Sequence, residues 1–124
     1  MVRFGAYSDE QLVGWSYGWF ERPDTFYMAN SGVLPSHRRV GVYSQLVRAI
    51  VEHAQTHGAA TIQSRHSVLN TPVIVAKLKL GFIIAGTNFS AHMGLQVQLV
   101  HHVSPARADV FHHRVVAFVR PHDS

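Results

Sequence analysis

Residues 33–43 of this 124-residue chain read VLPSHRRVGVY and join a predicted strand, at about residues 25–33, to the start of a predicted helix. A helix start presents backbone N–H groups without intrahelical partners and the positive end of the helix dipole, and both attract anions. Gly41 has no Cβ, so the backbone can approach a bulky anion there or adopt a positive φ. Arg38 and Arg39 add positive charge. The segment predicts a phosphate or pyrophosphate site; a plain helix start with solvated arginines remains the alternative.

The helix that follows shows the clearest periodicity in the chain. Its apolar side chains recur at intervals of three and four residues, as expected of an amphipathic helix with one buried face. Gly58 follows the last of them and is typical of a helix C-terminus. The apolar positions are Tyr43, Leu46, Val47, Ile50, Val51 and Ala54.

The remaining segments alternate between strand and helix patterns. Strands are predicted at about residues 2–7, 12–20, 60–66, 82–89 and 95–103, with a possible further strand at 109–120. Short turns join the first three strands, which predicts an antiparallel meander. A second helix begins after Asn70, which can cap it, carries Pro72 in its first turn and stops at Gly81. The passage from the strand ending at Val33 to the strand at 60–66 predicts a parallel crossover.

The length fits one domain over residues 1–124, and the strand and helix patterns make it α/β. Hydrophobic residues form 47% of the chain and cysteine is absent, which excludes disulfides and cysteine-ligated zinc. No signal peptide or long apolar run is present, so a cytoplasmic protein is expected. Basic residues outnumber acidic ones by 11 to 7, but only Arg38 and Arg39 are adjacent, so nucleic-acid binding is a third alternative.

Two further patterns stand in order along the chain. The first is Val33-Leu34-Pro35 followed by Arg38-x-x-Gly41-x-Tyr43, and the second is Asn70 with Lys79-Leu80-Gly81-Phe82, whose Gly81 lies eleven residues after Asn70. In this order the two motifs resemble those of the GNAT (Gcn5-related) N-acyltransferase family. The resemblance implies a mixed, mostly antiparallel sheet with two helices. It covers a core at about residues 2–103, which leaves an extension at 104–124. It also implies transfer of an acyl group, expected to be acetyl from acetyl-CoA, to an amine that attacks the thioester directly.

The resemblance further implies which residues hold the cofactor. Val33 and Leu34 would orient the pantetheine, and Asn70 would contact the cofactor arm. Tyr43 replaces a small residue of the family motif, so its ring must point away from the phosphates. The pyrophosphate would be bound through backbone groups of Arg38, Arg39, Val40, Gly41, Val42, Tyr43 and Ser44.

The catalytic groups depart from the family pattern. Lys77 stands where many relatives have a tyrosine that protonates the leaving thiolate, and no glutamate precedes Val33. His66 is the candidate replacement base because histidine titrates near neutral pH. A merely hydrogen-bonded or exposed His66 remains open, since direct attack by a neutral amine needs no dedicated base.

The family normally begins with a strand and two helices that are expected to be missing here. The sheet face that carries Trp15 and Trp19 would then lack its cover, which predicts a homodimer. The alternative function is a non-catalytic CoA-binding or dimerisation module. Ten histidines are present, but the adjacent pairs would point to opposite strand faces, so no metal is expected.

Overall fold

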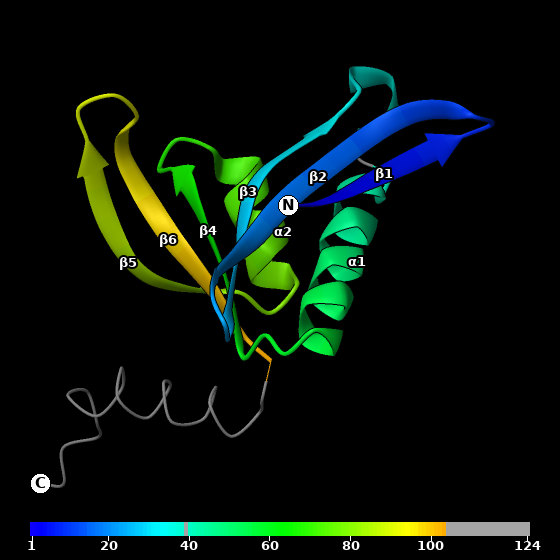
Figure 1. Ribbon diagram of the computed structural model, residues 1–124. Coiled ribbons are helices and arrows are strands. Elements are labelled where there is room, and N and C mark those ends of the chain that lie inside the picture. Colours follow the sequence, from blue (N-terminus) through cyan, green and yellow to red (C-terminus); the bar gives the residue numbers. More distant parts are fainter. Residues whose placement is uncertain (39, 104–124) are drawn as a thin grey trace, which may run out of the picture.

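The computed structural model describes residues 1–38 and 40–103. They form a mixed six-stranded sheet in the order β1-β2-β3-β4-β6-β5 with two α-helices (Figure 1), which confirms the predicted fold class. The predicted strand at 109–120 and the extension at 104–124 lie outside the described residues. The elements are β1 (Val2–Ser8), β2 (Gln11–Arg22), β3 (Thr25–Val33), the 3₁₀ turn η1 (Pro35–His37), α1 (Val42–Thr56), β4 (Thr61–Ser67), α2 (Thr71–Lys79), β5 (Ile83–Ser90) and β6 (Gly94–His102).

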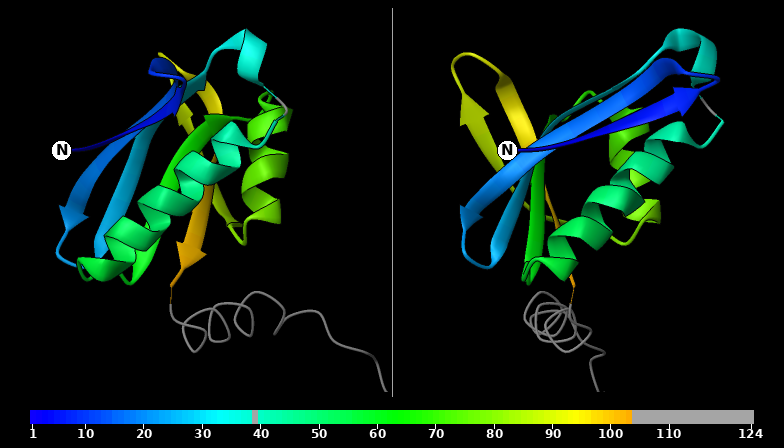
Figure 2. Two further views of the ribbon diagram at one scale, coloured as in Figure 1. Left: turned by 90° about the vertical axis from the view of Figure 1, so that its right-hand side faces the viewer. Right: turned by 45° about the vertical axis from the view of Figure 1, so that its right-hand side comes forward.

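The sheet consists of two antiparallel halves that meet along a short parallel ladder. β1, β2 and β3 form the predicted meander, and β4, β6 and β5 form the other half. Residues 25–27 of β3 pair in parallel with residues 61–63 of β4, which confirms the predicted parallel crossover. Beyond this ladder, residues 28–33 and 64–67 separate, and the two halves spread apart (Figure 2). We call this feature the β3–β4 divergence.

Both helices pack on the same face of the sheet. α1 buries its predicted apolar face, and Val47 and Met28 lie in one core cluster. Lys77 of α2 contacts Met28 from the same side. Gly58 follows the end of α1 with φ of 95°, and Gly81 follows α2 with φ of 95°, so both predicted helix ends are confirmed.

Asn70 is the N-cap residue of α2, but its side chain makes no capping hydrogen bond, so that part of the prediction is wrong. Its backbone has φ of −84° and ψ of 65°, whereas a capping side chain normally stands on an extended residue. The backbone is used instead: the Asn70 N–H donates to Ser67, and the Asn70 carbonyl accepts from Ile74.

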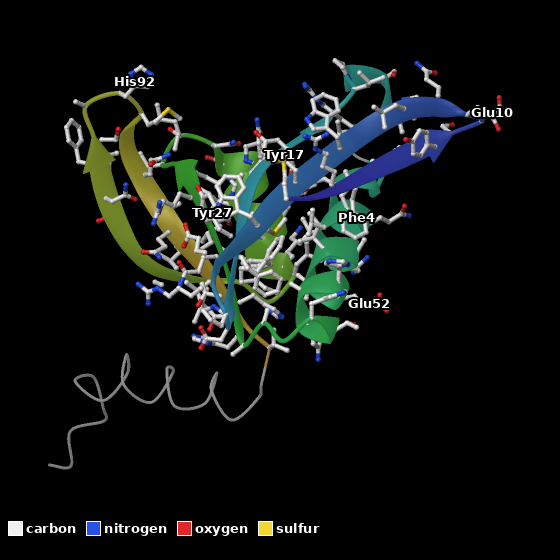
Figure 3. The ribbon with its side chains drawn as sticks, in the orientation of Figure 1. Phe4, Glu10, Tyr17, Tyr27, Glu52 and His92 are labelled. Atoms are coloured by element: carbon white, nitrogen blue, oxygen red, sulfur yellow. The ribbon has the colours of Figure 1, made fainter. Side chains whose placement is uncertain are left out.

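The opposite face of the sheet carries a row of partly exposed aromatic side chains. Trp15 and Trp19 are 41% and 37% exposed. The Trp15 ring lies over Gly32, where a Cβ would come within 2.3 Å of it, and the rings of Trp19 and Tyr27 are 5.5 Å apart. Figure 3 shows Tyr27 on β3, while Phe4 reaches toward α1, where its ring meets His53. No helix in the described residues is long and apolar enough to cross a membrane.

Candidate functional site

The turn between η1 and α1 has the geometry of an anion cradle. Gly41 adopts φ of 87° and ψ of 3°, which confirms the possibility of a positive φ, and a Cβ there would meet nothing within 4 Å. The Gly41 carbonyl accepts the N–H of Gln45 at 3.0 Å, and this is the first hydrogen bond of α1. The N–H groups of Val42, Tyr43 and Ser44 therefore lack intrahelical partners and point out of the helix start.

Side chains around the cradle leave its backbone accessible. The Tyr43 ring packs against the core, and burial raises the pKa of its hydroxyl. This agrees with the prediction that the ring points away from the phosphates. Val40 is exposed, and Arg39 lies outside the described residues. Arg38 donates from Nε to the Val33 carbonyl at 3.0 Å, so its guanidinium lies against the end of β3.

The β3 edge of the divergence carries peptide groups that no neighbouring strand pairs. The Leu34 N–H donates to the Val13 carbonyl of β2 at 2.8 Å, so alternate residues, Ser31 and Val33, direct their peptide groups toward the divergence. Local side chains occupy two of these groups. The Ser31 N–H donates to Asn30 Oδ1 at 2.8 Å, and the Val33 carbonyl accepts from Arg38.

Leu34 is held differently from Val33, although both were predicted to orient the pantetheine. The Leu34 N–H is bonded to Val13, and its carbonyl accepts the His37 N–H at 2.8 Å. Both backbone groups of Leu34 thus have partners within the chain, whereas Val33 lies on the open edge.

Lys77 of α2 lies at the closed end of the divergence. Met28 and Ser64 are the first residues past the last β3–β4 pair, and Lys77 Nζ donates to Met28 Sδ at 3.3 Å and to Ser64 Oγ at 3.0 Å. It also lies 4.3 Å from the centre of the Phe82 ring. The residue is only 1% exposed, and no carboxylate is among these contacts. Desolvation by burial lowers its pKa from 10.5 to about 7.

His66, the predicted base, is joined to Lys77 through a hydroxyl. His66 Nε2 lies 3.0 Å from Ser64 Oγ, and Ser64 is fully buried. Burial, and secondly the nearby Lys77 charge, lower the His66 pKa from 6.5 to about 4. His66 is therefore neutral at physiological pH and forms one end of a hydrogen-bonded line of Lys77, Ser64 and His66. Its role as a base stays a prediction.

Sequence reasoning noticed Lys77 as a substitution but missed its burial and its partners. The available signal was spacing: Ile74 packs against the core, and Lys77 follows it at i+3 on the same helix face. Met28 and Ser64 look like ordinary strand residues, and only the fold brings them together.

The described histidines are not gathered into a metal centre. Within residues 1–38 and 40–103, no group of three His, Asp or Glu side chains could hold a metal ion. His101 instead lies 5.2 Å from the Phe82 ring, and its Nδ1 is 3.3 Å from the Gly81 carbonyl.

Known families and structures match this arrangement. Residues 1–82 match the model of the "Acetyltransferase (GNAT) family". The fold is similar to that of the IAA acetyltransferase from Bacillus cereus ATCC 14579, with a TM-score of 0.77 and 18% identity over 82% of this chain and 77% of that chain. It is also similar to the ribosomal-protein-S18-alanine N-acetyltransferase from Escherichia coli, with a TM-score of 0.73 and 17% identity over 83% and 69% of the two chains.

A third similar structure contains the cofactor. It is a GNAT family acetyltransferase from Elizabethkingia anophelis with acetyl-CoA bound, with a TM-score of 0.72 and 13% identity over 82% of this chain and 75% of that chain. No curated protein sequence matches the chain. The fold is that of acyl-CoA N-acyltransferases. By its family match the chain belongs to the GNAT acetyltransferases, a family of enzymes that use acetyl-CoA.

Proposed function

We propose that this chain transfers the acetyl group of acetyl-CoA to an amine, which attacks the thioester carbonyl directly in a ternary complex. The observation that carries the proposal is the β3–β4 divergence, which has an anion cradle at its open end and proton-exchanging side chains at its closed end. A thioester held between the two ends would meet groups suited to each of its parts.

The cofactor would lie along β3. The backbone of residues 38–44 would bind the pyrophosphate, with Gly41 leaving room and the α1 dipole adding positive potential. The Val33 carbonyl and the Ser31 N–H would pair with the pantetheine amides after Arg38 and Asn30 release them. Arg38, once released, would turn to the phosphates. Leu34 would fix the strand end through Val13, and Asn70 would contact the cofactor arm from the start of α2.

His66 is the group we assign to accept the proton of the attacking amine. It is neutral and half-buried, and it is joined through Ser64 to Lys77. Its low pKa makes it a weak base, so positioning of a neutral amine against the thioester would supply most of the acceleration.

The test is release of free CoA thiol from acetyl-CoA with a panel of small amines, amino acids and peptide N-termini. Thiol should appear only with both enzyme and acceptor, and G41E, which puts bulk and negative charge in the cradle, should abolish it. The control is G58E, because Gly58 also has a positive φ and open space but lies at the far end of α1. Tight acetyl-CoA binding without transfer to any amine would favour a non-catalytic CoA-binding module instead.

We further propose a cytoplasmic homodimer that covers the Trp15 and Trp19 face. Both rings are more than one-third exposed on a sheet face where Tyr7 and Leu12 are also exposed. The double variant W15S/W19S should shift a concentration-dependent dimer to monomer in sedimentation velocity. L69S, which changes an exposed leucine in the β4–α2 turn, should leave it a dimer. Equal masses for wild type and W15S/W19S would contradict this interface.

A further inference from the structure

Lys77 is a buried titratable group to which the proposed transfer reaction assigns no step of its own. Burying an ammonium costs free energy unless it is paired, and the Lys77 ammonium contacts a hydroxyl, a thioether and an aromatic ring. A core position of this kind is more stably filled by an apolar side chain. Stability alone therefore does not account for an amine at this place.

The position of Nζ matters more than its burial. Nζ bridges Met28 on one strand and Ser64 on the other, at the first residues beyond the β3–β4 ladder. A molecule inserted between the strands from the cradle side would end against this amine. Because the side chain is only 1% exposed, reagents in bulk solvent have little access to it.

We propose that Lys77 is itself an acyl acceptor, and that a CoA thioester seated in the β3–β4 divergence acylates its Nζ. The inference rests on the proposed function, because it requires the same bound acetyl-CoA. It adds a self-modification site and a second, intramolecular amine substrate to the transfer reaction.

The reaction balances without any further reagent. The Nζ lone pair attacks the thioester carbonyl carbon, a C–N bond forms, and the C–S bond breaks. The nitrogen loses one proton, and the departing CoA thiolate takes up one proton. Ser64 Oγ, 3.0 Å from both Nζ and His66 Nε2, lies where it can pass this proton on. The products are N6-acetyl-lysine and free CoA, and nothing is oxidised or reduced.

The electrostatics favour this chemistry. Only a neutral amine is nucleophilic, and the pKa of about 7 leaves roughly half of Lys77 neutral at pH 7. An ordinary lysine is neutral in only about one molecule in several thousand at that pH. Among the described residues, His66 is the titratable group that interacts with Lys77, while Met28, Ser64 and Phe82 are uncharged. The product amide carries no charge, so the desolvation that disfavours the ammonium does not oppose it.

The chain supplies its own control, because its lysines are Lys77 and the exposed Lys79. The full chain is incubated with acetyl-CoA, and the modified residue is located by tandem mass spectrometry. We expect one acetyl group on Lys77, with ~10-fold or more excess over Lys79. The rate should rise through about pH 7 and then level off, whereas modification of Lys79 should keep rising at higher pH.

Variants separate this inference from the proposed function. K77R should remove the acetyl group and K79R should not, while G41E should prevent acetylation of an intact Lys77 and G58E should not. Acetyl phosphate, which lacks the CoA moiety, should favour Lys79 over Lys77. If acetyl-CoA stabilises the protein against unfolding but Lys77 stays unmodified, the inference is wrong and the proposed function stands. If acetyl-CoA does not bind, both are wrong.

Discussion

The two ends of the β3–β4 divergence are formed by different kinds of chemical group. At the open end, the cradle consists of backbone from consecutive residues, arranged by Gly41 and the start of α1. At the closed end, side chains from three elements meet, with Lys77, Ser64 and Met28 separated by up to 49 residues. A site made of backbone groups from consecutive residues can be recognised in the sequence as a motif. A site of converging side chains exists only after the sheet has formed.

The largest expected effect concerns the closed end, where a buried amine replaces an apolar contact. K77M should raise the free energy of unfolding at pH 7 by about 1–4 kcal/mol, because it removes a desolvated amine that has no carboxylate among its described contacts. Urea unfolding of K77M beside K79M measures this. A K77M protein less stable than wild type would show that the Lys77 contacts outweigh its desolvation.

The same variant has a pH signature. The folded pKa of about 7 is below the unfolded value of 10.5, so the unfolded chain binds more protons between these values. Wild-type stability should therefore increase as the pH rises from about 7 toward 10.5. Over the accessible part of that window, K77M should lack the increase.

A smaller effect is expected from paired changes at the two ends of α1. Gly41 and Gly58 have φ of 87° and 95° and open space beyond Cα. G41A and G58A should each lower stability by about 1 kcal/mol, since alanine strains the left-handed conformation. Only G41A should also weaken acetyl-CoA binding in calorimetry. Equal acetyl-CoA affinities for the two variants would show that Gly41 is not part of the cofactor site.

Arg38 should contribute about as much to binding as a single exposed charge. R38A should weaken acetyl-CoA binding by about 1 kcal/mol at low salt and by less at high salt, because exposed charges are screened. R48A, which removes an exposed arginine from the middle of α1, is the control. A salt-independent loss in R38A would point to its bond with Val33 rather than to its charge.

The smallest effect belongs to His66. Its folded pKa of about 4 is below 6.5, so wild-type stability should fall as the pH drops from 6.5 toward 4. The side chain is partly exposed, so H66Q should flatten this loss by no more than about 1 kcal/mol. Acid unfolding of H66Q beside H92Q measures this effect. Identical unfolding curves for the two variants would contradict the lowered pKa of His66.

Most of the fold could be predicted from the sequence because its elements have clean periods. The helix from Val42 and the meander of the first three strands followed from apolar spacing and turns alone. Asn70 was predicted correctly as a position and wrongly as a side-chain cap, because residue type does not determine φ and ψ. The separation of β3 and β4 after residue 27 is a property of sheet pairing that no local pattern records.

The candidate site divides in the same way. Residues 33–44 were found through their motif, since the relevant groups are backbone atoms of neighbouring residues. The backbone groups of Leu34 are hydrogen-bonded to Val13 and His37, and these bonds depend on the neighbouring strand and turn. The lowered pKa of Lys77 could not be predicted, because it arises from burial against Met28, Ser64 and Phe82.

The most direct test of the account is thermal or urea unfolding with and without acetyl-CoA for wild type, G41E and G58E. At ~100 times the dissociation constant, the ligand should stabilise wild type and G58E by about 2.7 kcal/mol and leave G41E unchanged. Folded wild type that gains no stability from acetyl-CoA, or G41E that gains as much as G58E, would contradict the assignment of the cofactor to the β3–β4 divergence.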